Sequence, residues 1–403
     1  METVKPETVG LSSSSLERID RVMQRYVERG QLAGIITALT RRGRMAHFGM
    51  YGQMDIAAAK PLHEDAIFRI FSMTKPITSL AVMMLHEEGG FHLQYPISMF
   101  IPELADLKVL SNQMEIGSER EPLARPITIH DLLTHTSGLG YGLDKLLPVD
   151  ALLLQAKILR MDETLAEKMS RLAQFPLHHQ PGLRFTYSFG IDVLGRLVEV
   201  VGGMPLDQFF KQRIFEPLGM MDTDFYVPPE KAERLATLYS TGPDGKLEDM
   251  GKLDNGNPPH FISGAWINKD MRPRFLSGGA GLVSTTADYL RFGMMLRGQG
   301  ELDGVRLVSR KTIELMTAPH LRPDQYFLQG ASFGLGFTVL TSPAQAGMLG
   351  SVGAYEAGGA AHTNLWYDPH EDLMGLLMVQ YVSSTPSMVG MDFKSLAVAA
   401  IED

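Results

Sequence analysis

The chain contains no cysteine, and this absence excludes several kinds of chemistry at once. Disulfides, thiolate nucleophiles, zinc sites with cysteine ligands and iron–sulfur clusters all need that side chain. The sequence also lacks any apolar run close to the roughly 18 residues of a membrane-spanning helix. Residues 1–7 show neither the basic nor the apolar segment of a signal peptide. We therefore expect a cytoplasmic protein with no membrane partner.

Clusters of lysine and arginine are missing as well, and the formal net charge is −9. Contacts to nucleic acid phosphates need clustered positive charge, so we expect no nucleic-acid partner. The 403 residues are 44% hydrophobic and 21% charged, which is typical of a globular chain. A chain of this length can bury a large core and form two lobes.

Hydrophobic patterns place strands at both ends of the chain and helices in the middle. Helical spacing occurs at 14–29, 74–88, 128–135, 149–173, 190–202, 205–214, 287–297 and 387–401, and strand-like runs at 34–40, 45–51, 336–340, 362–367 and 373–381. Thr285-Thr-Ala-Asp288 predicts a capping box for one helix. These patterns predict an α+β fold, in which an antiparallel sheet built from both termini is flanked by terminal helices and interrupted by a mainly helical lobe.

The same patterns predict how the chain divides into domains. We expect residues 1–70 and 275–403 to form the sheet domain and residues 71–274 to form the mainly helical domain. An active site would then lie in the cleft between the two.

Ser72-Met-Thr-Lys75 is the only Ser-x-x-Lys sequence in the chain, and it opens a predicted helix after the apolar run 66–71. Residues three apart on a helix share a face, so Ser72 and Lys75 would be neighbours. A serine hydroxyl becomes a good nucleophile only when a neighbour takes its proton, and a buried lysine can do this. The helix N-terminus also suits a developing oxyanion. The four residues alone favour a plainer alternative, in which Ser72 caps the helix and Lys75 is exposed.

Other segments favour the catalytic interpretation, because they follow one another in a familiar order. They are Phe71–Ile77, Thr128–Leu139, Pro181–Ser188, Glu216–Met220 and Ser277–Asp288. In this order they resemble the serine β-lactamase and penicillin-binding-protein superfamily, and within it the class C-like enzymes and family VIII carboxylesterases. The resemblance covers nearly the whole chain. It implies a serine hydrolase that forms an acyl-enzyme and needs no metal and no cofactor.

The second motif of class C enzymes is Tyr-x-Asn, and the matching residues here are Tyr187-Ser188-Phe189. The resemblance implies that Tyr187 lies near Ser72 and Lys75 and relays a proton to the leaving group. The asparagine is replaced by Phe189, which argues against a β-lactamase. We expect Phe189 to form an apolar wall suited to ester acyl or alcohol groups.

The third motif is Lys-Thr-Gly in class C enzymes and often Trp-Gly-Gly in the esterases. The matching residues here are Ala357, Gly358 and Gly359, and we expect them to bind substrate because glycines let a ligand approach the backbone. The resemblance further implies an oxyanion hole made of the Ser72 and Ala360 backbone N–H groups. Tyr141, in the glycine-rich segment 138–142, is predicted to line the cleft.

Two further patterns are set aside. Gly330-Ala-Ser-Phe-Gly334 matches G-x-S-x-G, but a nucleophile elbow needs a strand before it and a helix after it. Here a polar loop precedes Ser332 and a strand follows. Two histidine pairs lack the supporting carboxylate pattern of a metal motif, so we expect no metal there: His130 with His135, and His178 with His179.

The sequence thus predicts a carboxylesterase whose partner is a small-molecule ester with a small to medium acyl group. The alternatives are an acyltransferase that uses the same acyl-enzyme, a weak β-lactamase or D-amino-acid peptidase, and a binding protein without catalysis. Retention of Ser72, Lys75 and Tyr187 together argues against the last of these. The layout also resembles fungal polyketide-side-chain acyltransferases of the superfamily, so hydrolysis and transfer stay open.

Overall fold

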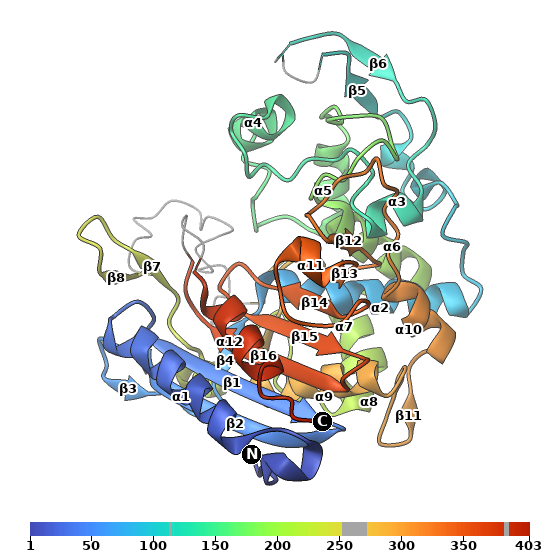
Figure 1. Ribbon diagram of the computed structural model, residues 1–403. Helices are drawn as coiled ribbons and strands as arrows, with labels where there is room; N and C mark the ends of the chain where they lie inside the picture. Colours follow the sequence, from blue (N-terminus) through green and yellow to red (C-terminus); the bar gives the residue numbers. More distant parts are fainter. Residues whose placement is uncertain (113–114, 116, 252–271, 383–386) are drawn as a thin grey trace.

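Both ends of the chain contribute strands to one eight-stranded antiparallel sheet (Figure 1). The computed structural model describes residues 1–112, 115, 117–251, 272–382 and 387–403. The strand order is β12-β13-β14-β15-β16-β1-β2-β3. The strands are β1 Gly34–Arg41, β2 Arg44–Asp55, β3 Lys60–Pro61, β12 Ala331–Phe333, β13 Thr338–Leu340, β14 Tyr355–Gly358, β15 Asn364–Asp368 and β16 Leu373–Val379. β1 pairs with β16, so the sheet joins the two ends of the sequence.

The central strands are apolar on both faces because each face packs on a separate core. Successive side chains of a strand point to opposite faces, so Ile35 belongs to one core and Ile36 to the other. The terminal helices α1 (Ser13–Glu28) and α12 (Val389–Val398) cover the first face. The larger core on the second face joins the sheet to the helices in the middle of the chain.

Most helices lie between β4 and β9 in the sequence, and in Figure 1 α3, α4 and α5 lie above the sheet. The helices are α2 Thr74–Glu87, α3 Ile129–Leu133, α4 Pro148–Gln155, α5 Leu165–Leu172, α6 Gly190–Gly202, α7 Leu206–Phe210, α8 Glu216–Leu218, α9 Thr286–Arg297, α10 Arg310–Met316 and α11 Pro343–Ala346. Four short strand pairs complete the fold: β4 Ile67–Arg69 with β9 Val283–Thr285, β5 Lys108–Leu110 with β6 Arg120–Pro122, β7 Tyr239–Thr241 with β8 Leu247–Asp249, and β10 Glu301–Leu302 with β11 Val305–Arg306. This architecture confirms the predicted α+β class.

Several predicted elements differ from the structure. The single helix predicted at 149–173 is wrong, because α4 ends near Lys157, whose φ of 50° is left-handed, and α5 starts afresh. Thr164 and Glu167 form a full capping box at that second start. The strand predicted from residue 336 begins only at Thr338.

The capping box predicted at Thr285 is only half formed. The Thr285 side chain accepts a hydrogen bond from the Asp288 N–H at 3.2 Å, as predicted. The Asp288 carboxylate does not reach back, and instead accepts from the Asp222 N–H and the Thr223 hydroxyl. Asp288 therefore ties the start of α9 to the segment that follows α8.

Candidate active site

Ser72 lies in a tight turn, η2 (Phe71–Met73), that leads directly into α2. Phe71 has a φ of 43°, a left-handed value that a residue with a side chain rarely adopts. Its ring is buried in the large core, and that packing holds the turn in place. Met73 occupies the N-cap of α2, and the Lys75 residue is only 3% exposed. The structure therefore rules out the alternative in which Ser72 caps the helix and Lys75 is exposed.

Lys75 and Tyr187 converge on the Ser72 hydroxyl. Lys75 Nζ donates to Ser72 Oγ at 3.1 Å and to the Gly279 carbonyl at 2.8 Å. Tyr187 Oη donates to Ser72 Oγ at 2.7 Å. The Lys75 ammonium also lies 4.5 Å from the centre of the Tyr187 ring and 5.4 Å from that of Tyr141. Lys75 and Tyr187, which are predicted to act with Ser72, therefore both lie within hydrogen-bonding distance of its hydroxyl.

The third-motif strand, β14, packs beside the turn that carries Ser72. Ala357 points into the large core, whereas Gly358 is exposed. A Cβ on Gly359 would lie 2.4 Å from the Ile70 carbonyl oxygen, so only glycine allows this close approach. Thr363 Oγ1 donates to the same carbonyl at 3.3 Å.

Ala360 follows Gly359 in the exposed turn between β14 and β15. The turn is fixed by a hydrogen bond from the Gly359 N–H to the Thr363 carbonyl at 2.7 Å. Gly358 and Gly359 also border a cavity of about 210 Å³. None of Ser72, Lys75 and Tyr187 lines this cavity, so the backbone predicted to contact substrate is linked to the nucleophile by its packing against the Ser72 turn.

The family model for the beta-lactamase family matches residues 19–400 of this chain. The chain belongs to the beta-lactamase family. It is 37% identical to Protein Rv1367c of Mycobacterium tuberculosis over 87% of this chain and 86% of that protein. It is 31% identical to Esterase EstB of Burkholderia gladioli over 91% of this chain and 90% of the esterase. The solved structure of "EstCE1, a hydrolase with promiscuous acyltransferase activity" superposes with a TM-score of 0.80 at 27% identity, covering 97% of this chain and 99% of that chain.

Two predicted pocket residues of this beta-lactamase family chain are buried. Phe189 is 0% exposed and Tyr141 is 3% exposed, and their ring centres lie 4.6 Å apart. Tyr141 also stands edge-on to Tyr187 at 5.6 Å. Phe189 has no surface to offer a substrate, which differs from the predicted apolar wall, because its ring lies in the large core between Tyr141 and Lys168. Tyr141 instead packs against Tyr187 and Lys75, and Phe189 packs against Tyr141.

Asp192 on α6 is a buried carboxylate that sequence patterns do not single out. Its Oδ1 accepts from the Ser277 hydroxyl at 2.6 Å and from the Gly279 N–H at 3.2 Å. Burial raises the pKa of Asp192, although the Ser277 hydrogen bond and the charge of Lys75 oppose this. Asp192 thereby fixes the turn whose carbonyl binds Lys75. The sequence marks Ser277–Asp288 as a family segment, but nothing in it links that segment to Asp192.

The histidines that could suggest a metal have other partners. His130 bonds to His320 at 3.1 Å, His178 to Asp150 at 3.0 Å, and His179 to Thr186 at 2.9 Å. In the described part of the chain, no three histidine, aspartate or glutamate side chains gather as metal ligands would. Helices able to cross a bilayer are likewise absent from the described residues.

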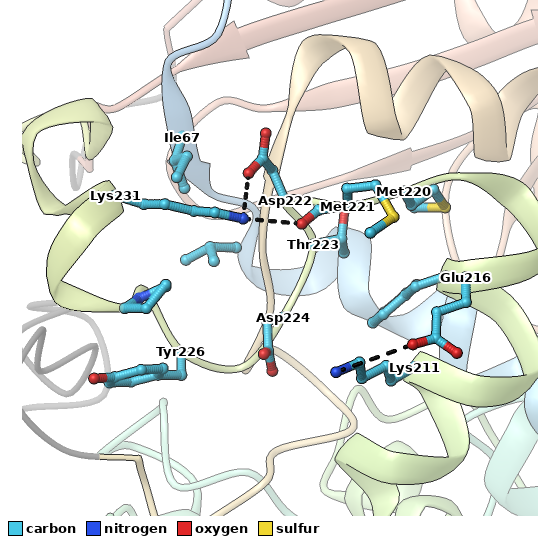
Figure 2. A pocket seen from close by; sticks show the side chains of 13 residues that line it. Ile67, Lys211, Glu216, Met220, Met221, Asp222, Thr223, Asp224, Tyr226 and Lys231 are labelled. Carbon is cyan, nitrogen blue, oxygen red and sulfur yellow. Dashed lines mark hydrogen bonds and ion pairs between the residues drawn. The ribbon is translucent and has the colours of Figure 1, made fainter.

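A second cavity of about 180 Å³ lies between β4 and the chain that follows α8 (Figure 2). Four of its charged lining residues form two pairs, Lys231 with Asp222 at 2.7 Å and Lys211 with Glu216 at 4.0 Å. The fifth, Asp224, pairs with Arg272 at 3.6 Å. None of Ser72, Lys75 and Tyr187 lines it. This cavity is therefore separate from the catalytic candidates.

Proposed function

We propose that the protein is a serine carboxylesterase that hydrolyses small to medium acyl esters through an acyl-enzyme on Ser72. One observation carries the proposal, namely that Ser72 Oγ lies 3.1 Å from Lys75 Nζ and 2.7 Å from Tyr187 Oη. A hydroxyl within hydrogen-bonding distance of two groups that can exchange a proton with it has the arrangement of an activated nucleophile. The names of EstB and EstCE1 support ester chemistry, and the general class is an acyl-enzyme hydrolase or acyltransferase.

Acylation would proceed by attack of Ser72 Oγ on the ester carbonyl carbon. Lys75 in its neutral amine form, together with Tyr187, takes the hydroxyl proton as the new C–O bond forms. The N–H groups of Ser72 and Ala360 stabilise the negative oxygen of the tetrahedral intermediate. The bond to the alcohol oxygen then breaks, and the alcohol leaves with the proton that Lys75 and Tyr187 had taken.

Deacylation would repeat these steps with water. Water attacks the acyl-serine carbonyl and its proton passes to the same pair. The Ser72–acyl bond then breaks to release the acid, and the proton returns to Ser72 Oγ. Each half of the cycle conserves protons, so it requires no co-reactant beyond water.

The second candidate is acyl transfer, in which an alcohol replaces water in the second half. The similarity to EstCE1, a hydrolase that also has acyltransferase activity, favours keeping it. A β-lactamase is less well supported, because Ala357 and Phe189 stand where class C enzymes have lysine and asparagine. We expect slow nitrocefin turnover beside rapid ester turnover.

The test is steady-state hydrolysis of p-nitrophenyl butyrate by wild type, Ser72→Ala and Ser332→Ala. Ser332 is a fair control because it lies on edge strand β12 in the G-x-S-x-G match. We expect only Ser72→Ala to lose turnover; turnover that survives in Ser72→Ala contradicts the proposal. Adding a primary alcohol and measuring the butyrate ester that forms then separates transfer from hydrolysis.

A further inference from the structure

His135 contacts Tyr187 and both of its neighbours in the chain. Its carbonyl accepts the Thr186 N–H at 2.7 Å, and its ring nitrogen Nδ1 accepts the Ser188 N–H at 3.3 Å. The His135 and Tyr187 ring centres lie 4.7 Å apart. One residue therefore binds both backbone neighbours of Tyr187 and packs on the tyrosine ring itself.

The backbone of His135 is in the left-handed region, which is uncommon for residues with a side chain, although histidine is found there more often than most. Its φ is 55°, and it lies two residues after the end of α3. Glycine and asparagine adopt such left-handed values more readily than other residues. A strained residue persists only where its surroundings fix it, and such residues cluster at functional sites. The imidazole is the part of His135 that glycine would lack.

The hydrogen bond from Ser188 also determines where the imidazole carries its proton. Nδ1 accepts the Ser188 N–H and lies 3.3 Å from the Ser188 hydroxyl, whose proton it can also accept, so the proton of the neutral ring is on Nε2. Nε2 is buried and has no hydrogen-bond partner among the described residues. Burial and, secondarily, the charge of Lys75 hold the pKa of His135 well below its usual range. The ring is therefore a neutral acceptor and does not serve as a general acid.

We infer that His135 is a positioning residue that fixes Tyr187 against Ser72 through its carbonyl and its Nδ1 acceptor. The inference rests on the proposed function, since it assigns the reason for the 2.7 Å contact between Tyr187 Oη and Ser72 Oγ. A displacement of about 1 Å at a reacting group can lower the rate about 10²-fold. Losing the imidazole acceptor frees the Ser188 end of the segment and misplaces the phenol.

The experiment compares two substitutions that keep the left-handed backbone. His135→Gly removes the imidazole, whereas His135→Asn keeps a side-chain oxygen that can accept the Ser188 N–H. With p-nitrophenyl butyrate, we expect His135→Gly to lower kcat at least tenfold with little change in KM. We expect His135→Asn to recover most of that loss. Equal losses in Gly and Asn overturn the inference.

A second comparison uses the Tyr187→Phe background. If His135 acts through the Tyr187 hydroxyl, His135→Gly should lower kcat less than about threefold once that hydroxyl is gone. If His135→Gly lowers kcat by the same factor in wild type and in Tyr187→Phe, the two residues act independently and the inference is overturned. If His135→Gly does not fold, His135→Leu is compared with His135→Gln instead, because both bear the same left-handed backbone but only glutamine keeps a side-chain acceptor.

Two controls separate the possible failures. His47→Gln changes a buried histidine that bonds to Thr37 within the sheet, and it should leave kcat unchanged. Ser72→Ala must abolish turnover; if it does not, the proposed function fails. If Ser72→Ala abolishes turnover while His135→Gly lowers kcat by the same factor in wild type and in Tyr187→Phe, the proposed function stands and only the positioning role fails.

Discussion

The surroundings of Ser72 set it apart from an ordinary surface serine. A buried ammonium is costly without polar partners, and Lys75 has two, the Ser72 hydroxyl and the Gly279 carbonyl. Two tyrosine rings flank the same ammonium. The three groups at Ser72 are therefore packed so that none can move far without loss of contact.

The Tyr187 hydroxyl can be removed without removing its ring. Tyr187→Phe keeps the packing on Lys75 and His135 but loses the bond to Ser72 Oγ, so we expect kcat to fall about 10²–10⁴-fold. The matched control is Tyr26→Phe, which loses a hydrogen bond to Asp392 on the far face of the sheet. Ester kinetics and thermal unfolding of both variants provide the measurement. A Tyr187→Phe enzyme within threefold of wild type would remove Tyr187 from the mechanism.

His179 makes stability depend on pH. Burial lowers the pKa of His179 to about 4, whereas the unfolded chain binds this proton near pH 6.5. Between these pH values the unfolded chain binds a proton at His179 and the folded protein does not. The free energy of unfolding therefore falls as the pH drops from 6.5 towards 4, by at most about 3 kcal/mol.

Urea unfolding of wild type and His179→Gln at pH 7.5 and 5 measures this contribution. Wild type should lose more stability than the variant between the two pH values. Equal losses in the two proteins would show that His179 does not supply the pH dependence.

At the level of elements, periodic segments were predictable from sequence and contacts between distant segments were not. The α2 and α6 patterns gave nearly correct bounds, because an apolar face repeats every turn. The prediction of one helix at 149–173 failed because apolar residues continue through the turn between α4 and α5. That turn contains Lys157, with its left-handed backbone, and ends at Thr164, the N-cap of α5. Ser72, Lys75 and Tyr187 were found through local motifs. Asp192 and His135 were missed as partners, because their roles depend on contacts across the chain.

The packing of the third-motif turn on the Ser72 turn can be tested at Gly359. An added methyl would meet the Ile70 carbonyl oxygen at 2.4 Å and Thr363 Oγ1 at 2.3 Å, so Gly359→Ala must push the two turns apart. We expect kcat to fall at least tenfold, because Ala360 moves away from Ser72. Gly390→Ala on α12, whose methyl would meet only Leu377 at 3.8 Å, is the control. Unchanged kcat in Gly359→Ala would exclude this packing from the oxyanion site.

In the whole molecule, one sheet separates two hydrophobic cores, and only one of them surrounds the catalytic candidates. The core around α1 and α12 contains none of the catalytic candidates, whereas the other core holds the buried residues around Ser72. The candidates come from segments on both sides of the boundaries predicted at residues 71 and 274. The division into two domains and the cleft between them stay predictions.

The terminal core should therefore control stability without controlling catalysis. Phe393 on α12 is fully buried beside Trp366, so Phe393→Ala should lower the free energy of unfolding by about 3–5 kcal/mol. Activity per folded molecule should stay unchanged. Ser395→Ala, on the exposed side of the same helix, should change stability by less than about 0.5 kcal/mol. Lost activity in folded Phe393→Ala would show that the two cores are coupled.

The nucleophile itself is tested most directly by intact-mass spectrometry after reaction with a fluorophosphonate, followed by peptide mapping. We expect one adduct, located on Ser72, in wild type and Ser332→Ala, and none in Ser72→Ala. An adduct on another residue, or undiminished labelling of Ser72→Ala, would contradict the assignment of Ser72 as the nucleophile.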